Sequence, residues 1–172
     1  MNSRSINIYI RRLQSVNCPL LDITSKTVST IEAIIHVILK NICFSIKKVI
    51  ILTDRKTISV SDIDTSIRFL IPTELALNMI AFSNQAVILF GQSERNEKKE
   101  RILTREKRSG LIFSVSLTEK YIRDFGFCNY NVSSLSPVFL AASIEYFIKQ
   151  LLILTAGITI DSKKVRMTPR HV

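Results

Sequence analysis

A segment without glycine or proline, residues 27–52, places the strongest constraint on the fold of this chain. Its apolar residues recur at steps of three and four, which predicts one long helix. The recurring residues are Val28, Ile31, Ile35, Ile38, Ile42, Ile46 and Val49. At 1.5 Å per residue this helix would be about 39 Å long. Because Ile34 and Phe44 lie on further faces, short neighbours cannot cover it, and we expect a partner helix of similar length to cross it.

The segments around this helix suggest a pattern of short helix, loop, long helix, loop and short helix. Short helices are predicted at residues 6–16 and 60–71, followed by a further helix at 74–90. Ser59 with Asp62 three residues later is a capping-box pattern for the helix at 60–71.

The same pattern begins again after a polar, charged segment at residues 91–108, which we interpret as a linker. Gly91 is its only helix breaker, so part of it can be helical. A short helix is predicted at 115–123, and Pro137 opens a second long helix that reaches about Ile158. Thr168 and Pro169 are typical of the start of another short helix.

The charge of the chain indicates a polyanionic partner. Its 172 residues include 24 Lys and Arg against 14 Asp and Glu, a net charge of +10. Residues 1–90 carry 10 basic and 6 acidic groups, residues 91–110 carry 7 and 4, and residues 111–172 carry 7 and 4. Because the excess is spread along the chain, it suits an extended binding path. Nucleic acid is the first candidate and an anionic membrane surface the second.

Other classes of site find little support. The three cysteines are widely spaced, and only two histidines accompany them, so neither a disulfide framework nor a zinc site is predicted. We expect reduced and partly buried thiols at Cys18, Cys43 and Cys128. The N-terminus lacks the apolar run of a signal peptide, and residues 33–46, taken as the most apolar stretch, are too short to span a membrane. These features favour an intracellular, soluble protein.

Several sequence segments resemble the core histones. In the second half, RSGLIFSV at 108–115, SPVFLAASIEYF at 136–147 and DSKKVRMTPRH at 161–171 are similar to histone 2A, with one apparent inserted residue near Phe125. In the first half, NIYI at 7–10, ITSK at 23–26, DRKTIS at 54–59 and TSIRFLIPTELA at 65–76 resemble histone 2B without a gap. The order of 2B then 2A is similar to the fused histone doublets of giant DNA viruses.

This resemblance implies an all-α protein with two histone folds in tandem, which form an intramolecular handshake pseudodimer. Fusion makes the pairing of the two folds intramolecular and raises their effective concentration to about the millimolar range or above. The implied division is a 2B-like fold with an extra C-terminal helix at 1–92, a charged linker at 93–108, and a 2A-like fold at 109–172. We expect that second fold to lack its third helix and docking segment.

The resemblance also assigns DNA-contacting residues, since histone pairs bind DNA at paired loops and helix N-termini. In the first half these are Arg12, Thr24, Ser25, Lys26, Arg55, Lys56 and Thr57, and in the second half Arg105, Arg108, Lys120, Arg123, Lys163, Lys164 and Arg166. Arg55 and Arg166 match minor-groove arginines. Arg55 also has the family's spacing for a loop-to-helix ion pair with Asp62, and the sequence leaves open whether Asp62 prefers Arg55 or the helix cap.

Departures from the family predict weaker contacts at some positions. Asn131 and Leu117 stand where arginines are usual. Of the acidic patch that docks nuclear factors, only Glu74 and Glu145 remain as a residual patch, and long basic N-terminal tails are absent.

The implied function is DNA binding and compaction without sequence reading, as a subunit of viral nucleosome-like particles that package a genome. The expected partners are double-stranded DNA and a histone type-three and type-four pair or its viral doublet equivalent, with no membrane and no small-molecule substrate. The expected places are the viral factory or host nucleus and virion chromatin. No catalytic constellation, metal site or cofactor motif competes, so no enzyme is predicted. The alternative is a histone-fold interaction module of a transcription or regulatory complex.

Overall fold

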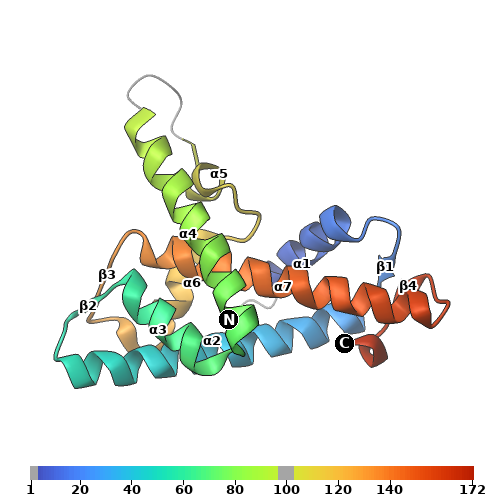
Figure 1. Cartoon of the computed structure of the whole chain (residues 1–172), viewed down its shortest axis with the longest axis horizontal. Coiled ribbons are helices and arrows are strands. Elements are labelled where there is room, and N and C mark those ends of the chain that lie inside the picture. The colour runs from blue at the N-terminus through green and yellow to red at the C-terminus, as the bar shows by residue number, and fades with distance from the viewer. Residues whose placement is uncertain (1–3, 97–102) are drawn as a thin grey trace. The chain divides into compact units, whose positions relative to one another are not determined.

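The computed structural model describes residues 4–96 and 103–172. Within them the chain is mostly helical, and its strands are only two residues long (Figure 1). In the first half the elements are α1 (Arg4–Asn17), β1 (Asp22–Ile23), α2 (Ser25–Thr53), β2 (Thr57–Ile58), α3 (Val60–Leu70) and α4 (Thr73–Asn96). In the second half they are α5 (Arg105–Ser109), α6 (Val115–Ile122), the π-helical turn η1 (Arg123–Phe127), β3 (Asn131–Val132), α7 (Ser136–Asp161), β4 (Arg166–Met167) and the 3-10 turn η2 (Pro169–His171).

The predicted helices are confirmed, with small shifts of their ends. The two long helices are α2, with 29 residues, and α7, with 26 residues. The predicted short helix after Thr168 is the single turn η2. The linker is helical in part, as expected, because α4 continues through Gly91 to Asn96 and α5 begins at Arg105. Linker residues 97–102 lie outside the described residues.

The structure divides into two compact units, and each unit takes segments from both halves of the sequence. Unit 1 combines Met1–Val37 with Glu145–Val172, and unit 2 is Ile38–Ile144. The helices α2 and α7 each contribute one segment to each unit. Each unit thus contains segments from both halves of the sequence, and the prediction of an all-α fold whose two halves pair within one chain is confirmed.

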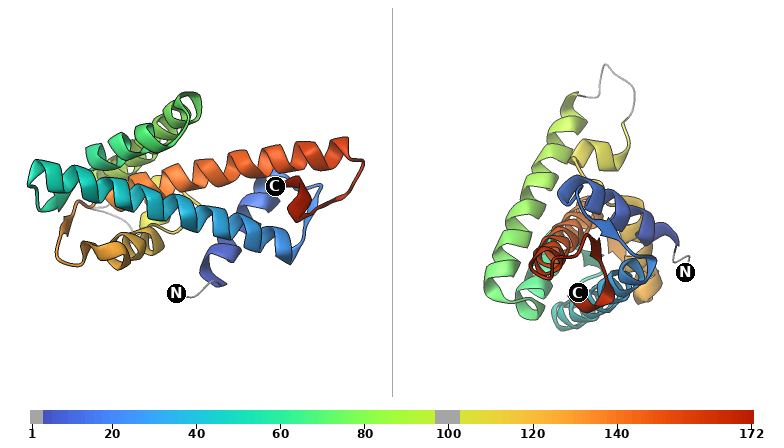
Figure 2. Two further views of the ribbon diagram at one scale, coloured as in Figure 1. Left: turned by 90° about the horizontal axis from the view of Figure 1, so that it is seen from below. Right: turned by 90° about the vertical axis from the view of Figure 1, so that its right-hand side faces the viewer.

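Unit 1 is built on an apolar face of α1. Its residues Ile6, Ile10 and Leu13 recur at the spacing of one helix face and are buried to within 2% exposure. The loop that carries β1 pairs in parallel with the loop that carries β4 (Figure 2). Cys18 is buried, and its thiol is 3.8 Å from the carbonyl oxygen of Leu152 in α7.

Unit 2 has its own core. Phe113, Tyr121 and Phe127 around α6 and η1 are almost completely buried. The helix α4 lies next to α3 and α5. Ser83 of α4 and Ser143 of α7 share a buried hydrogen bond of 2.7 Å, so their hydroxyl groups are satisfied inside this core. The strand β2 pairs in parallel with β3.

The cysteines differ in exposure. Burial raises the pKa of Cys43 to about 12 and also raises the pKa of Cys18. Cys128 is exposed, which corrects the expectation of partial burial. It directly follows the kinked turn η1, where Gly126 has a left-handed φ of +100°, and its side chain lies outside the core that buries the preceding Phe127.

Two helices are long and apolar enough to cross a membrane by length and composition alone: α7, and α4 over residues 73–93. The mean hydropathy of the apolar window is 1.6 in α7 and 1.2 in α4. Within the protein 61% of the α7 window is buried, as expected for a core helix, against 33% for α4.

Candidate nucleic-acid interface

Two short parallel strand pairs bring the predicted DNA-contacting loops together, one pair in each unit. In unit 1, Asp22 lies opposite Arg166. The amide of Thr24 donates to the carbonyl oxygen of Met167 at 3.2 Å, and Thr27 Oγ1 donates to the same oxygen at 3.0 Å. These bonds hold the basic loop after α7 beside the first turn of α2, where backbone N–H groups lack intrahelical partners.

The loops of unit 1 are densely cationic. Lys26, Lys163, Lys164 and Arg166 are all exposed. Arg166 Nη2 is 3.3 Å from Asp22 Oδ2, and the two side chains are 62% and 76% exposed. Because so exposed an ion pair contributes little, the guanidinium can exchange Asp22 for a phosphate.

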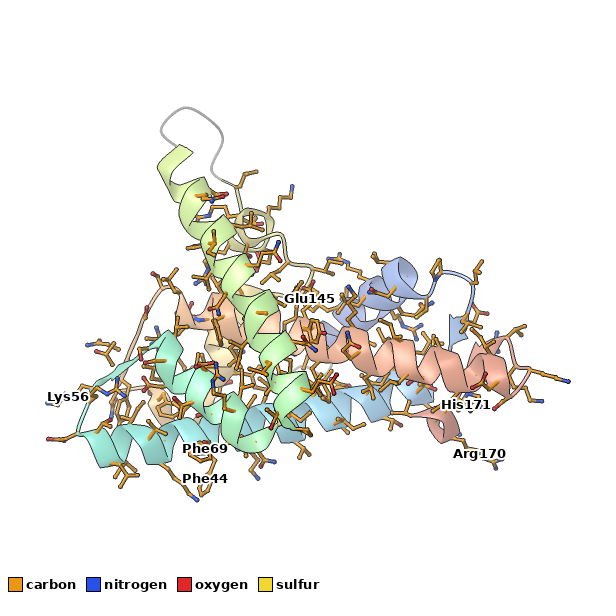
Figure 3. The ribbon with its side chains drawn as sticks, viewed as in Figure 1. Phe44, Lys56, Phe69, Glu145, Arg170 and His171 are labelled. Carbon is orange, nitrogen blue, oxygen red and sulfur yellow. The ribbon has the colours of Figure 1, made fainter. Side chains whose placement is uncertain are left out.

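The turn η2 adds two basic-type side chains that the sequence analysis did not assign, Arg170 and His171 (Figure 3). They line a hollow of about 550 Å³ together with Lys164 and Arg166. His171 is held in place because its Nδ1 lies 3.3 Å from the amide nitrogen of Thr168, which donates to it. Arg170 could have been found from its position four residues after Arg166 in the same basic segment.

The first helix supplies two arginines to unit 1. Arg12, which the resemblance assigned, is exposed and lies over the ring of Tyr9 at 5.8 Å. Arg11 was missed, although its Nη2 donates to Ser25 Oγ at 3.1 Å, directly at the start of α2. The signal was available, since the buried positions Ile10 and Leu13 of α1 leave both arginines on its outer side.

The loop pair of unit 2 repeats the same backbone pattern. Thr57 lies opposite Asn131, whose backbone N–H donates to the carbonyl oxygen of Lys56 at 2.9 Å. Ser136 Oγ donates to the carbonyl oxygen of Ile58 at 3.1 Å. This bond corresponds to the one from Thr27 Oγ1 to the carbonyl oxygen of Met167 in unit 1. The side chain of Lys56 points away from the ribbon at this loop (Figure 3). Asn131 is exposed beside it, and supplies an amide where an arginine would supply a charge.

Asp62 performs both roles between which the sequence could not choose. Its Oδ1 accepts from Arg55 Nη2 at 2.5 Å, and its Oδ2 accepts from the backbone N–H of Ser59 at 2.8 Å. The Asp62 side chain is 1% exposed, whereas that of Arg55 is 43% exposed. The predicted ion pair and the predicted capping box are therefore both confirmed, and the guanidinium is anchored while part of it faces solvent.

Three basic residues of the second half are engaged by other side chains. Arg105 Nη1 and Arg123 Nη2 bind the two oxygens of Glu119 at 2.8 and 3.0 Å. These hydrogen bonds lower the pKa of Glu119. The guanidinium of Arg108 lies over the Phe90 ring at 4.6 Å and is half-buried. DNA contact by these arginines stays a prediction.

Two further predicted positions differ in exposure. Lys120 on α6 is exposed, as a phosphate contact requires. Leu117 on the same helix is half-buried, so it contributes apolar packing at a position where the family usually has an arginine. The predicted weaker DNA contact at Leu117 is consistent with this, and it too stays a prediction.

The two residues of the predicted acidic patch, Glu74 and Glu145, differ in exposure. Glu74 is exposed in the first turn of α4, where a negative charge is favourable for the helix dipole. Glu145 is only 6% exposed, because α7 is buried along this part of its length. Of the two predicted patch residues, only Glu74 is therefore exposed. Among residues 4–96 and 103–172, no cluster of His, Cys, Asp and Glu could hold a metal ion.

Curated proteins that are similar to this chain include histones. No family model matches the chain. It is 33% identical over 117 residues to a histone doublet of Melbournevirus that joins histones 2B and 2A, which covers 68% of this chain and 42% of that protein. It is 36% identical over 80 residues to histone 2AX of Dictyostelium discoideum, over 46% of this chain and 51% of that protein. The chain thus spans about half the length of the curated relatives it matches.

A solved structure supports the fold independently of sequence. The histone of Methanopyrus kandleri superposes with a TM-score of 0.58 at 11% identity, over 96% of this chain and 88% of that one. At so low an identity this likeness concerns the fold alone. This chain is a histone-fold protein of the histone-doublet type.

Proposed function

We propose that this chain binds and bends double-stranded DNA without reading its sequence, as a structural, non-enzymatic subunit of viral nucleosome-like particles. The observation that carries the proposal is the strand pair of unit 1. It holds Lys163, Lys164 and Arg166 beside the N-terminus of α2, which begins at Ser25. Cations and open backbone N–H groups in one place are what a phosphate group requires.

The second loop pair supports the same function. Arg55 is oriented by Asp62 and keeps nearly half of its side chain exposed, so it can enter a minor groove without first being ordered. Lys56 adds an exposed positive charge in the same loop. Since these groups recognise phosphates and groove width rather than base edges, DNA of any sequence is an acceptable ligand. The place of action is chromatin of the infected cell or of the virion.

An exposed apolar surface on α2 and α3 supports a protein partner within the particle. Phe44 and Phe69 lie near each other on these two helices (Figure 3) and are 61% and 79% exposed. With Leu52 and Leu70 they border a hollow of about 370 Å³. A second histone pair, either of types three and four or a viral doublet equivalent, would bury this surface through helix packing.

A salt titration on two unrelated random-sequence duplexes tests the DNA proposal. We expect the logarithm of the affinity to fall linearly with the logarithm of the salt concentration, with the same slope for both duplexes. Micrococcal nuclease digestion of the protein reconstituted with DNA and its histone partner should then leave a protected fragment. Salt-independent binding, preference for one short motif, or partner binding without any DNA protection would favour the alternative, an interaction module of a regulatory complex.

A further inference from the structure

The turn η2 in unit 1 has an imidazole at the capping-box position that usually carries a glutamate or glutamine. The backbone N–H of Thr168 donates to His171 Nδ1 at 3.3 Å. An imidazole nitrogen accepts a hydrogen bond only while it carries no proton itself. This cap therefore requires a neutral ring whose single proton is on Nε2.

A second group faces the same ring nitrogen. Thr159 Oγ1 of α7 lies 2.9 Å from His171 Nδ1, and this hydroxyl also donates to the carbonyl oxygen of Thr155 at 2.7 Å. Because its one proton is used there, the oxygen offers lone pairs to the ring. A ring that is protonated on Nδ1 would donate to Thr159 and would release the N–H of Thr168. The site thus has a hydrogen bond for each charge state of His171.

The hollow of about 550 Å³ beside η2 places this ring among cations. Lys164 and Arg166 line it from the loop after α7, Arg170 lines it from the same turn as His171 (Figure 3), and no acidic residue is among its lining residues. Asp22 of β1 pairs with the Arg166 guanidinium. Three further charged residues at this end of unit 1 are exposed and lie outside the lining: Lys26, Asp161 and Lys163. A phosphate in the hollow would favour a protonated ring, because the opposite charges attract.

We propose that DNA binds the protonated form of His171, so that its imidazolium is a further phosphate-binding group of unit 1 and DNA affinity rises as the pH falls. Imidazoles ordinarily change charge between about pH 5 and 8, whereas lysine and arginine side chains stay charged over this range. The inference rests on the proposed DNA binding and adds its regulation by protons. Unit 2 lacks this response, since Asp62 occupies the equivalent position there.

The test measures binding of the full chain to a random-sequence duplex by fluorescence anisotropy, over a range of salt at about pH 5.5 and about pH 7.5. We expect about threefold tighter binding at the lower pH. The salt slope should be steeper there by about 0.9, the contribution of one further phosphate contact.

Three variants identify the group that takes up the proton. His171→Gln keeps an acceptor for the cap but carries no charge, so it should remove the difference between the two pH values. His171→Lys is charged at both and should show the steeper slope at both. His36→Gln is the matched control, because it removes the other of the two histidines in the sequence and should leave the difference unchanged.

NMR of the nitrogen nuclei in the histidine rings tests the exchange of hydrogen bonds without DNA. At about pH 7.5 the His171 ring should carry its proton on Nε2 alone, and at about pH 5.5 on both nitrogens. The Thr168 N–H should lose its protection from hydrogen exchange at the lower pH. Adding the duplex at about pH 6.5 should increase the protonated fraction of His171 and leave that of His36 unchanged.

Four results would overturn the inference. Equal salt slopes at both pH values, or a pH response that persists in His171→Gln, would show that His171 does not couple protons to DNA, while the DNA-binding function would stand. A proton on Nδ1 at about pH 7.5 would show that the ring donates to Thr159 throughout and does not switch. Absence of DNA binding at both pH values would contradict the proposed function itself and its regulation with it.

Discussion

The loop pairs of unit 1 and unit 2 share one backbone design but differ in how they hold their basic side chains. In both, the chain leaves a long helix through a residue with positive φ, Asp54 after α2 and Lys163 after α7. In both, a short strand then leads to a new helical turn. The third residue of that turn is Asp62 in unit 2 and His171 in unit 1. Unit 2 has a carboxylate at this position, which binds Arg55, and unit 1 has an imidazole there.

The consequence is a division between an anchored and an adaptable loop pair. Unit 2 fixes Arg55 on a buried carboxylate, which orders the guanidinium in the absence of any ligand. Unit 1 has no such carboxylate at His171, and its Arg166 contacts only the exposed Asp22 among the described residues. Unit 1 instead gathers more cations around its strands. Pre-ordering lowers the entropy cost of binding, whereas added charge increases the counterion release.

The largest expected effect is on stability, at the position that distinguishes the two loop pairs. Asp62→Ala should lower the free energy of unfolding by about 2–4 kcal/mol, because it removes an ion pair and a helix cap from a buried site. The equivalent change in unit 1, His171→Ala, should cost about 0.5–1 kcal/mol. Urea denaturation followed by circular dichroism measures both. Equal losses would show that the loop of unit 2 is not held more firmly.

The next effect is on DNA affinity. Lys164→Ala with Arg166→Ala in unit 1 should weaken binding to a random duplex about tenfold and reduce the salt slope by about 2. Arg55→Ala with Lys56→Ala removes the same charge from unit 2 and should weaken binding about threefold, since Asp62 already offsets one cation. Anisotropy titrations at several salt concentrations give both values. A larger loss for the unit 2 variant would contradict the view that unit 1 supplies more of the binding charge.

Releasing Arg166 should have a smaller effect of opposite sign. Asp22→Asn removes the exposed carboxylate from this arginine and should strengthen DNA binding about two- to threefold, with a stability change below about 0.5 kcal/mol. The same titrations and denaturation curves test it. Weaker DNA binding in this variant would mean that Asp22 orients Arg166 in unit 1, as Asp62 orients Arg55 in unit 2.

The smallest expected effect is the pH dependence of stability, which should come from Glu119 on α6 in unit 2 and has no counterpart at the arginines of α1 in unit 1. In unit 2, hydrogen bonds from Arg105 and Arg123 hold the pKa of Glu119 below its ordinary value of 4.5. Its contribution to stability is therefore complete above pH 4.5 and is lost as the pH falls through the lowered pKa. In unit 1, no carboxylate of the described residues pairs with Arg11 or Arg12.

Denaturation of the native chain and the Glu119→Gln variant over a range of pH measures this contribution. The difference in unfolding free energy should be constant above pH 4.5 and should shrink below it. We expect only a few tenths of a kcal/mol, because all three side chains are partly exposed and solvent screens them. A difference that does not change with pH would show that Glu119 contributes by packing alone.

Much of the candidate interface could be predicted because histone-like segments fix which loops carry the cations. Arg55, Lys56, Lys163, Lys164 and Arg166 all lie in the paired loops, as the resemblance implied. The prediction failed where exposure depends on neighbours distant in sequence. Glu145 is an acidic residue that the fold buries in α7, and Cys128 is exposed after a kink that the sequence pattern does not indicate.

By itself the sequence determined the helices, the cap at Ser59 and the tandem order of two histone-like halves, because these follow from contacts three or four residues apart and from local motifs. Only the tertiary structure decided which loops meet. Asp22 contacts Arg166 across 144 positions, and Thr57 lies opposite Asn131 in the other half. Such contacts depend on how whole helices bury their apolar faces, so the pattern around one residue cannot specify them.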